Sequence, residues 1–442
     1  MPVLPPRCAR KERAGVPTLR ALFAAATVAT ALASAGEPLT IGYYPAWSVY
    51  DRHYLIQQVE RSGAAERLDV LAYAFAAIGA DDGLTFADPP AELERPYTAA
   101  DSVDGVADPP DQGRLRGTFN QLRKLKRMHP ALRVVLSIGG WNGSARFSDL
   151  ALDPARRRAF AAACVERAIA GDFAPGLRQP GIFDGLDIDW EYPATAGASA
   201  HARSEDAQTF TALLGELRAA LDRRGAADGR RYLLTAALPA APVVYRKLEL
   251  AAIHPVLDLL MLMAYDFHGS WEDHTGPLAA LQPAAGDPLH DQQPCGARAL
   301  DDYRAAGVPA AKLVLGVPFY GHGWQLVAPG PRGDGMYQAA GGAAALAGGH
   351  GVADYRVLAR LAGGERHHDL ANVSAWSYDS VTRVLWSFDD ADTVRAKRAY
   401  ARAAGLGGVM CWDLGGDDEA GTLIRALAPA LPSPSAPSAP AR

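Results

Sequence analysis

The stretch FDGLDIDWEYP, from Phe183 to Pro193, alternates apolar and acidic side chains. The apolar positions are Leu186, Ile188 and Trp190, and the acidic positions are Asp187, Asp189 and Glu191. Successive side chains of a β-strand point to opposite faces, so this period of two predicts a strand with one apolar and one acidic face. Carboxylates two positions apart stand about 7 Å apart along a strand. Their mutual repulsion costs stability, so the row indicates catalysis or metal binding.

Short apolar runs recur along the chain, and helical stretches separate most of them. The eight runs span residues 39–44, 68–75, 132–140, 181–190, 232–239, 256–266, 312–321 and 405–414. Several are continuously apolar, as expected for strands buried on both faces of a parallel sheet. Helices are predicted between them at 118–128, 154–170, 207–224, 298–306 and 392–404. This alternation predicts an α/β fold, a single (β/α)8 TIM barrel over residues 36–427.

Two connections are too long for a minimal barrel. Residues 80–117 are polar and rich in Pro and Asp, and we expect an extended loop there. Residues 323–386 contain Gly/Ala-rich stretches and candidate strands, which predicts a small inserted α+β subdomain between strands 7 and 8. Loops that follow barrel strands rise from the carboxy-terminal face, where TIM barrels place their active sites. Both insertions are therefore expected to wall that face.

The two ends of the chain differ in composition from the rest. Residues 1–35 combine a basic leader, an apolar run at 21–33 and a small-residue cleavage pattern that ends at Ala35. This predicts a signal peptide and secretion to the extracellular space or periplasm, with an uncleaved membrane anchor as the alternative. After cleavage near Ala35, no membrane association is expected. Residues 428–442 are rich in Pro, Ser and Ala and predict a disordered tail.

Composition narrows the class of protein. The chain of 442 residues is 49% hydrophobic, which is enough for a large core, and its net charge of −5 gives no indication of a nucleic-acid partner. Cys164, Cys295 and Cys411 remain after signal cleavage, so at most one disulfide can form, and Cys411 is expected to be a buried thiol. Their spacing matches no metal site. We expect neither a metal nor a cofactor.

The three acids at 187, 189 and 191 form a titrating set. Close carboxylates cannot all ionise, so at least one pKa must rise. Glu191 lies at the end of the strand, nearest to a bound substrate, where a protonated acid could protonate a glycosidic oxygen. Most glycosidases use a second carboxylate as nucleophile or base. If the substrate carries a 2-acetamido group, its carbonyl oxygen can attack instead, and Asp189 need only orient that group and stabilise the resulting oxazolinium ion.

Several motifs resemble those of one enzyme family. DGLDIDWE at 184–191 resembles the DGxDxDxE signature of family 18 glycoside hydrolases, the chitinase family. SIGG at 137–140 is similar to the family's SxGG motif on the third strand, and MAYD at 263–266 is similar to its MxYD motif on the sixth. Trp412 matches the tryptophan that ends the eighth strand. The resemblance extends from about residue 39 to about residue 427.

The resemblance implies a role for each matching residue. Glu191 would be the acid/base, and Asp189 would hold the acetamido group and share a proton with Asp187. Tyr265 would hydrogen-bond the acetamido carbonyl, and Asp266 would bind the distorted sugar. The remaining pocket residues would be Trp412 as the floor, Trp141 on the leaving-group side, and Tyr43, Phe75, Met263 and Tyr320.

One position departs from the family pattern. The family often reads YGR after strand 7, whereas this chain reads YGH at 320–322. Histidine is shorter than arginine and titrates near neutral pH, so substrate affinity or its pH dependence is open at this position. His322 is therefore kept as a candidate binding residue.

The resemblance implies a monomeric, retaining chitinase that hydrolyses β-1,4 bonds between N-acetylglucosamine units of chitin and chitooligosaccharides. An endo-β-N-acetylglucosaminidase acting on N-glycans and a non-catalytic chitin-binding lectin are the alternatives. Calcium at the three acids is disfavoured, because calcium loops arrange acids around a glycine turn rather than along an apolar strand. His367, His368 and Asp369 suggest a metal cluster, but adjacent residues point apart, and we expect a solvated loop there.

Overall fold

The structure is a computed structural model that describes most of the chain. The described residues are 37–109, 114–197, 201–284, 286–287, 294–346 and 349–430. The predicted signal peptide at 1–35 and residues 431–442 of the predicted tail lie outside these ranges. Among the described helices, none is both long enough and apolar enough to cross a membrane.

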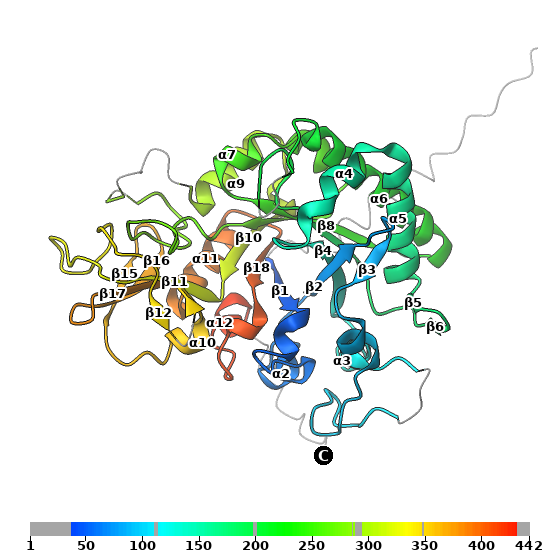
Figure 1. Ribbon diagram of the computed structural model, residues 1–442, viewed down its shortest axis with the longest axis horizontal. Coiled ribbons are helices and arrows are strands. Elements are labelled where there is room, and N and C mark those ends of the chain that lie inside the picture. Colours follow the sequence, from blue (N-terminus) through cyan, green and yellow to red (C-terminus); the bar gives the residue numbers. More distant parts are fainter. Residues whose placement is uncertain are drawn as a thin grey trace, which may run out of the picture.

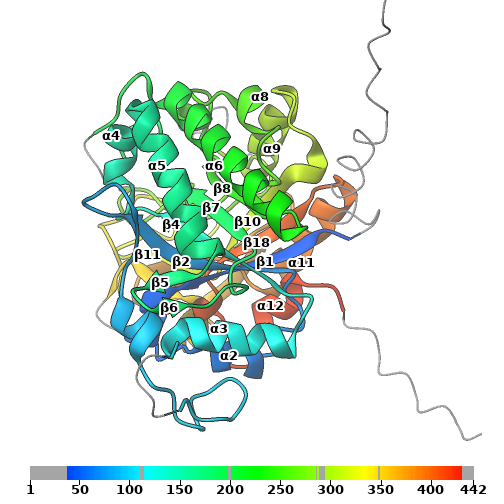
Figure 2. The same ribbon diagram turned by 90° about the vertical axis from the view of Figure 1, so that its right-hand side faces the viewer.

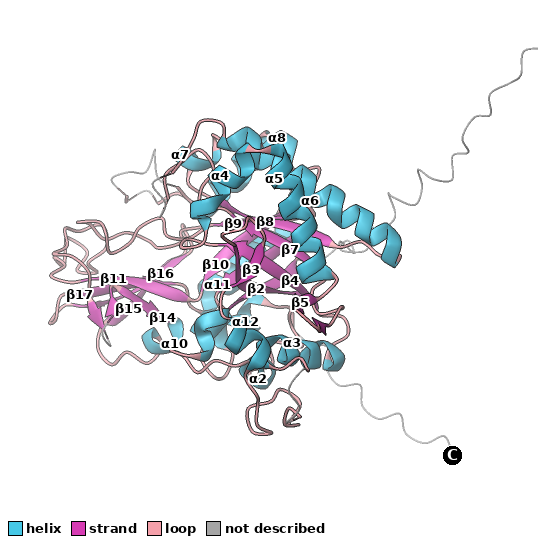
Figure 3. Cartoon of the chain, turned by 45° about the vertical axis from the view of Figure 1, so that its right-hand side comes forward, coloured by secondary structure: helices cyan, strands magenta, loops and turns pink. Residues whose placement is uncertain are grey.

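Eight parallel strands form a closed barrel at the centre of the molecule (Figure 3). They are β1 (Leu39–Pro45), β2 (Val70–Ile78), β4 (Arg133–Gly139), β7 (Gly185–Asp189), β8 (Leu233–Pro239), β9 (Leu259–Met263), β10 (Leu313–Pro318) and β18 (Gly408–Trp412). Each strand pairs with its neighbours in chain order, and β1 pairs with both β18 and β2, which closes the barrel. The predicted TIM barrel is confirmed.

Helices cover the outside of the barrel (Figure 2). They are α2 (Ile56–Arg61), α3 (Gly117–Met128), α4 (Phe147–Leu152), α5 (Pro154–Cys164), α6 (Asp206–Asp228), α7 (Pro242–Tyr245), α8 (Leu250–Ile253), α9 (Gly296–Ala305), α11 (Ala391–Ala403) and α12 (Thr422–Leu427). Asp153 and Asp390 begin α5 and α11, because each carboxylate accepts hydrogen bonds from free backbone N–H groups of the first turn. The predicted helix at 154–170 continues after α5 as a π-helical turn, Val165–Ile169.

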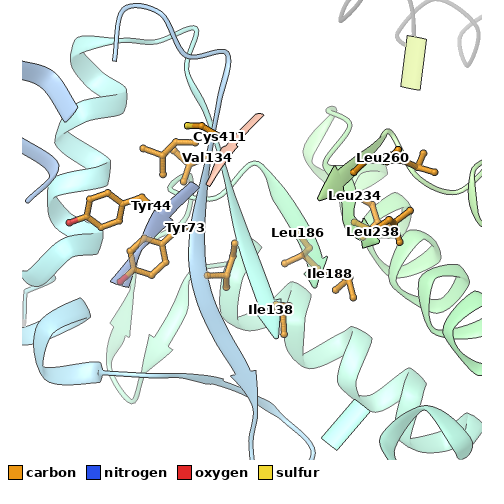
Figure 4. Packing of buried hydrophobic residues seen from close by; sticks show 14 of the residues in the cluster. Tyr44, Tyr73, Val134, Ile138, Leu186, Ile188, Leu234, Leu238, Leu260 and Cys411 are labelled. Atoms are coloured by element: carbon orange, nitrogen blue, oxygen red, sulfur yellow. The ribbon is translucent and has the colours of Figure 1, made fainter. Parts of the chain in front are cut away.

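Alternation along the strands separates the barrel interior from its helix-covered exterior. On β7, Leu186 and Ile188 are fully buried in the core that the strands share with the helices (Figure 4). A separate cluster, which includes Val135 and Met261, fills the interior of the barrel. Asp187 is fully buried and bonds Tyr43 of this interior cluster, so it points inward, as the period of two in the sequence predicts.

An aromatic cluster anchors α3 to the barrel. The ring of Phe119 is fully buried and makes edge-on contacts, with ring centroids 5.1–5.3 Å apart, with Tyr73, Phe86, Phe173 and Phe183. Phe119→Ala should lower the free energy of unfolding by about 3–5 kcal/mol, because the ring leaves a cavity that its neighbours cannot fill. Denaturant titration measures the loss. Leu370→Ala, at a position that is 86% exposed, should change stability by less than about 0.5 kcal/mol. Equal stability of the two variants would contradict the assignment of this cluster.

The first long connection departs from the extended loop predicted at 80–117. A short strand, β3 (Leu84–Phe86), pairs antiparallel with the end of β2, and Pro90–Glu94 forms a π-helical turn. Leu84 and Phe86 are both buried, so two apolar side chains at alternating positions are enough to form a strand within this polar segment. The loop prediction is wrong for these residues.

The second long connection forms an antiparallel sheet beside the barrel, coloured from yellow to orange in Figure 1. Its strands are β14 (Val352–Asp354), β11 (Tyr320–Trp324), β17 (Val384–Phe388), β16 (Ser374–Asp379) and β15 (Glu365–Asp369), in that spatial order. One short helix, α10 (Tyr355–Leu358), follows β14. The predicted insertion between barrel strands 7 and 8 is therefore present.

The border between barrel and insertion differs from the prediction. The apolar run at 312–321 is split, because β10 ends at Pro318 and β11 begins at Tyr320. Gly321 and His322 pair with Phe388 and Ser387 of β17 in the inserted sheet. The inserted sheet thus spans 320–388 rather than 323–386, and His322 belongs to it.

The three cysteines that are described remain thiols. Cys164, Cys295 and Cys411 are free and buried, so the one disulfide that the sequence allows does not form among them. Cys411 lies on β18 with no exposed surface, which confirms the predicted buried thiol. Burial raises the pKa of Cys411, so this thiol stays protonated.

Candidate active site

Two hollows at the carboxy-terminal end of the barrel join into one groove. Their volumes are about 460 and 630 Å³. They share the lining residues Trp141, Glu191, Tyr192, Asp266, Tyr320 and Trp412. Every predicted site residue except Asp187 lines at least one hollow, and His322 lines the second. The groove therefore brings together residues from the ends of many different strands.

Asp187 lies below the groove, within the barrel. Its carboxylate accepts hydrogen bonds from the hydroxyls of Tyr43 at 2.9 Å, Ser137 at 2.7 Å and Thr235 at 2.7 Å. Burial raises the pKa of Asp187, and these three hydrogen bonds oppose the rise. Asp187 and Asp189 make no hydrogen bond to each other, so the shared proton stays a prediction.

The SIGG motif brings β4 unusually close to β7. A Cβ added at Gly139, where φ is +116°, would lie 2.1 Å from the carbonyl oxygen of Asp189. The N–H of Gly140 donates to that same oxygen at 2.8 Å. The hydroxyl of Ser144 accepts the N–H of Glu191 at 2.9 Å. These contacts fix the backbone beside the carboxyls of Asp189 and Glu191, and only glycine allows the approach at position 139.

Asp189 is the middle acid of the row and is buried in the groove wall. Its Oδ1 atom is buried and has no hydrogen-bond partner among the described residues. Burial raises its pKa well above the usual range, and the charges of Glu191 and Asp187 add to the rise. A buried acceptor without a partner is costly, so Asp189 is poised to bind a donor supplied by a ligand.

Glu191 follows β7 and faces the groove. Burial raises its pKa to about 7; the hydroxyl of Tyr192 opposes this shift, and the charge of Asp266 adds to it. A carboxyl with this pKa is substantially protonated at neutral pH and can act as a general acid. Burial raises the pKa of all three carboxyls in the row, and Glu191 is the outermost of them.

Aromatic rings form the floor of the groove around Trp412. The ring of Phe75 stacks on Trp412 with centroids 5.6 Å apart and an interplanar angle of 20°. Tyr43 and Trp47 lie at tilted angles, with centroids 5.4 and 6.3 Å from that of Trp412. Apolar C–H faces of a sugar ring can pack on such a surface. Trp47 lies just after the apolar run at 39–44 and adds a further aromatic ring to this floor.

Asp266 is held between the barrel and the inserted sheet. The hydroxyl of Tyr320 donates to its Oδ1 at 2.6 Å, and Nε2 of His322 lies 3.2 Å from the same oxygen. The ring of Tyr265 lies edge-on to Tyr320, with centroids 6.1 Å apart. His322 therefore contacts Asp266 directly, and it reaches this position because the inserted sheet carries it.

Three groove residues were missed by the sequence analysis. Tyr192 directly follows Glu191, and this adjacency was the signal that could have identified it. Trp271 is 63% exposed and lies edge-on to His322, with centroids 5.0 Å apart, but it sits in a loop without periodicity. Arg52 bonds Asp413 through Nη1 and Asp354 through Nη2, at 2.7 and 2.8 Å, which joins the end of β18 to the inserted sheet.

The histidine pair at 367–368 lies away from this groove. Both residues belong to β15, so the predicted solvated loop is wrong, because residues 365–369 pair with β16. His367 stacks on Trp376 with centroids 5.3 Å apart, whereas His368 bonds Asp390 at 2.6 Å. The two rings point apart, as expected for adjacent residues of a strand.

The motifs and the site geometry agree with one family. The model for glycosyl hydrolases family 18 matches residues 39–417. This chain belongs to glycosyl hydrolase family 18. The family 18 match contains all the predicted site residues, from Tyr43 to Trp412, and therefore confirms the resemblance found in the sequence.

The family 18 chain is similar to several chitinases. It is 35% identical to Chitinase A1 of Niallia circulans over 409 residues, which cover 85% of this chain and 56% of that relative. The catalytic domain of psychrophilic chitinase B from Arthrobacter TAD20 has 34% identity and a TM-score of 0.82, and the match covers 88% of this chain and 94% of that domain. A family 18 chitinase from Cycas revoluta in complex with (GlcNAc)3 has 26% identity and a TM-score of 0.68, with 88% and 98% covered. The chain spans 56 to 60% of the length of the bacterial curated chitinases it matches.

Proposed function

We propose that this family 18 protein hydrolyses β-1,4 linkages between N-acetylglucosamine units of chitin and chitooligosaccharides. The observation that carries this proposal is the row of Asp187, Asp189 and Glu191, whose outermost carboxyl has its pKa raised to about 7. That acid can protonate a leaving glycosidic oxygen at neutral pH. The chitinase names of similar proteins, and the complex of one of them with (GlcNAc)3, support this choice of substrate.

In the proposed reaction, the substrate supplies its own nucleophile. Glu191 donates its proton to the glycosidic oxygen while the bond from that oxygen to the anomeric carbon breaks. The acetamido carbonyl oxygen of the same sugar bonds to that carbon from the opposite face and gives an oxazolinium ion. Glu191 then removes a proton from water, whose oxygen attacks the anomeric carbon. The bond from that carbon to the acetamido oxygen breaks, which opens the oxazolinium ring and restores the acetamido group. Two inversions give net retention of configuration.

The remaining groove residues hold the reacting sugar in this scheme. Asp189 would accept a hydrogen bond from the acetamido N–H through its unpartnered Oδ1. The hydroxyl of Tyr265 would donate to the acetamido carbonyl, and Asp266 would bind a sugar hydroxyl. Trp412 would pack against the apolar face of the ring. Each contact places the acetamido oxygen close to the anomeric carbon, which is the main requirement for attack within the substrate.

Product analysis tests this function. Purified protein is incubated with N-acetylchitohexaose beside a Glu191→Gln control, and the products are identified by mass spectrometry. We expect shorter N-acetylchitooligosaccharides from the unmutated protein alone. Cleavage of a high-mannose glycoprotein without cleavage of the hexaose would favour an endo-β-N-acetylglucosaminidase instead. Binding of the hexaose without cleavage in both proteins would favour a lectin.

Activity should fall as the pH rises through about 7. Glu191 must be protonated for the first step, and its pKa is raised to about 7, so the active fraction decreases above that pH. The dependence of kcat/KM on pH measures this limb. Glu92→Gln is the matched control, because the carboxyl of Glu92 is also buried with a pKa of about 7 but does not line the groove. In the control, kcat/KM should fall with rising pH as it does in the unmutated protein. Constant activity up to about pH 9 in the unmutated protein would contradict the role of Glu191.

We also propose that the protein is secreted. The basic leader and the apolar run within residues 1–35 support this proposal. Amino-terminal sequencing of protein recovered from outside the cytoplasm should give a start near Gly36. An intact Met1 on exported protein would contradict cleavage.

A further inference from the structure

A third hollow lies at the end of the barrel opposite to the groove. Its volume is about 880 Å³. Its lining includes Arg133 and Leu233, the first residues of β4 and β8, and Asp184, which directly precedes β7. None of its lining residues lines the groove. The hollow therefore belongs to the amino-terminal face of the barrel and takes no part in the proposed hydrolysis.

Positive charge is concentrated in this hollow. Its basic lining residues are Arg123, Lys126, Arg127, Arg133, Arg230 and Arg231, and its acidic ones are Asp184 and Asp258. The whole chain carries a net charge of −5, so this basic hollow opposes the overall sign of the protein. A concave surface lined by one sign of charge focuses its field and attracts ions of the opposite sign.

The two acids of the basic hollow are already occupied. Asp184 accepts from Nζ of Lys126 at 2.5 Å through one oxygen and from Arg230 at 2.6 Å through the other. Asp258 accepts from Arg231 at 2.9 Å and also from a backbone N–H at 2.9 Å. Neither carboxylate is left to neutralise the remaining arginines.

Two guanidinium groups of the basic hollow lack a partner. The side chains of Arg127 and Arg133 make no ion pair or hydrogen bond with any residue that the structure describes. Burial lowers the pKa of Lys126; its ion pair with Asp184 opposes this shift, and the charges of Arg230 and Arg133 add to it. Burial and the charge of Arg127 likewise lower the pKa of Arg123. The cations repel one another, and a bound anion would relieve this repulsion.

We propose that the basic hollow binds a soluble anion that carries two or more phosphate groups. A guanidinium group donates two parallel hydrogen bonds that match the oxygens of a phosphate, and two such groups are free here. The hollow shape admits a compact ion, whereas a membrane surface would have to reach into a concavity.

Titration calorimetry with inorganic tripolyphosphate tests this proposal. Ionic strength is held constant with sodium chloride, and we expect one anion bound per chain. The double variant Arg127→Gln/Arg133→Gln should bind at least about tenfold more weakly, because it loses two charge-assisted contacts. The matched control is Arg304→Gln/Arg395→Gln, which removes the same charge from exposed positions on α9 and α11. This control should bind as the unmutated protein does.

Three further measurements test whether the binding of tripolyphosphate is specific to the basic hollow. Hydrolysis of N-acetylchitohexaose should be equal in both double variants, which also shows that they are folded. The melting temperature of the unmutated protein should rise with tripolyphosphate and stay constant with sodium chloride of equal ionic strength. Orthophosphate should bind more weakly than tripolyphosphate.

Several results would overturn the proposal. Absence of binding to the unmutated protein, or an equal loss in the control variant, would show that no specific site exists. Orthophosphate that binds as tightly as tripolyphosphate would rule out a need for two phosphate groups. Binding to vesicles that contain phosphatidylglycerol, lost in Arg127→Gln/Arg133→Gln and without any binding of tripolyphosphate, would assign the hollow to a membrane surface instead.

Discussion

Glu191→Gln should lower kcat for N-acetylchitohexaose by about a thousandfold. The amide has the shape of the protonated carboxyl but cannot release its proton to the leaving oxygen. Affinity for the oligosaccharide should change little, because Trp412 and the rest of the groove are unaltered. The fold should also persist, because the substitution removes a carboxyl whose charge is disfavoured by burial.

Steady-state kinetics and calorimetric binding on the same samples measure the two effects separately. Glu92→Gln serves as the control for replacing a buried glutamate, since Glu92 bonds Tyr73 outside the groove. It should keep the turnover of the unmutated protein. Turnover in Glu191→Gln within about tenfold of the unmutated protein would show that another group donates the proton.

Asp189→Asn should lower kcat by about a hundredfold to a thousandfold, with a smaller change in KM. Burial and two neighbouring acids disfavour the charge of Asp189 in the free protein. Positive charge on the oxazolinium ion would favour the ionised form of Asp189, whose proton would pass to Asp187 in the predicted sharing, so the carboxylate stabilises the intermediate more than the substrate. Asparagine can still hydrogen-bond the acetamido group, but it has no negative charge with which to stabilise the positive intermediate.

A thiazoline mimic of the cyclic intermediate separates these contributions. It should inhibit the unmutated protein and bind Asp189→Asn much more weakly, whereas an intact oligosaccharide should bind both similarly. Asp69→Asn is the matched control, because Asp69 accepts a backbone hydrogen bond from Thr40 at the opposite end of the barrel. Equal inhibition of all three proteins would show that Asp189 does not stabilise the intermediate, and no inhibition of any of them would argue for a nucleophile supplied by the enzyme.

Much of the site could be predicted because it depends on local pattern. In 183–193, the direction of each side chain follows from its position along the strand. The row of acids and the apolar face opposite to it could therefore be predicted without tertiary information. Residues 137–140, 263–266 and 412 were likewise found from motifs at strand ends. Tyr192 shows the limit of this approach. It adjoins Glu191, but no motif or periodicity in the sequence marks it as a residue of the groove.

The missed features depend on contacts between distant parts of the chain. The apolar run at 312–321 reads as one strand, and only pairing of Gly321 with Phe388 shows where the inserted sheet begins. Arg52 meets Asp413 and Asp354, which are 361 and 302 positions away. Leu84 and Phe86 form the strand β3 within a polar segment, because β3 pairs with β2 and both side chains are buried there.

The sequence by itself determined the barrel, the row of acids and the family to which they belong, because strand periodicity and motif spacing are local properties. Only the tertiary structure decided which carboxyls are buried, that Oδ1 of Asp189 lacks a partner, and that His322 reaches Asp266 from the inserted sheet. It also assembled the basic hollow from separate segments at the starts of several strands. The physical reason is that desolvation and charge interactions depend on every group packed around an atom, and most of those groups are remote in the chain.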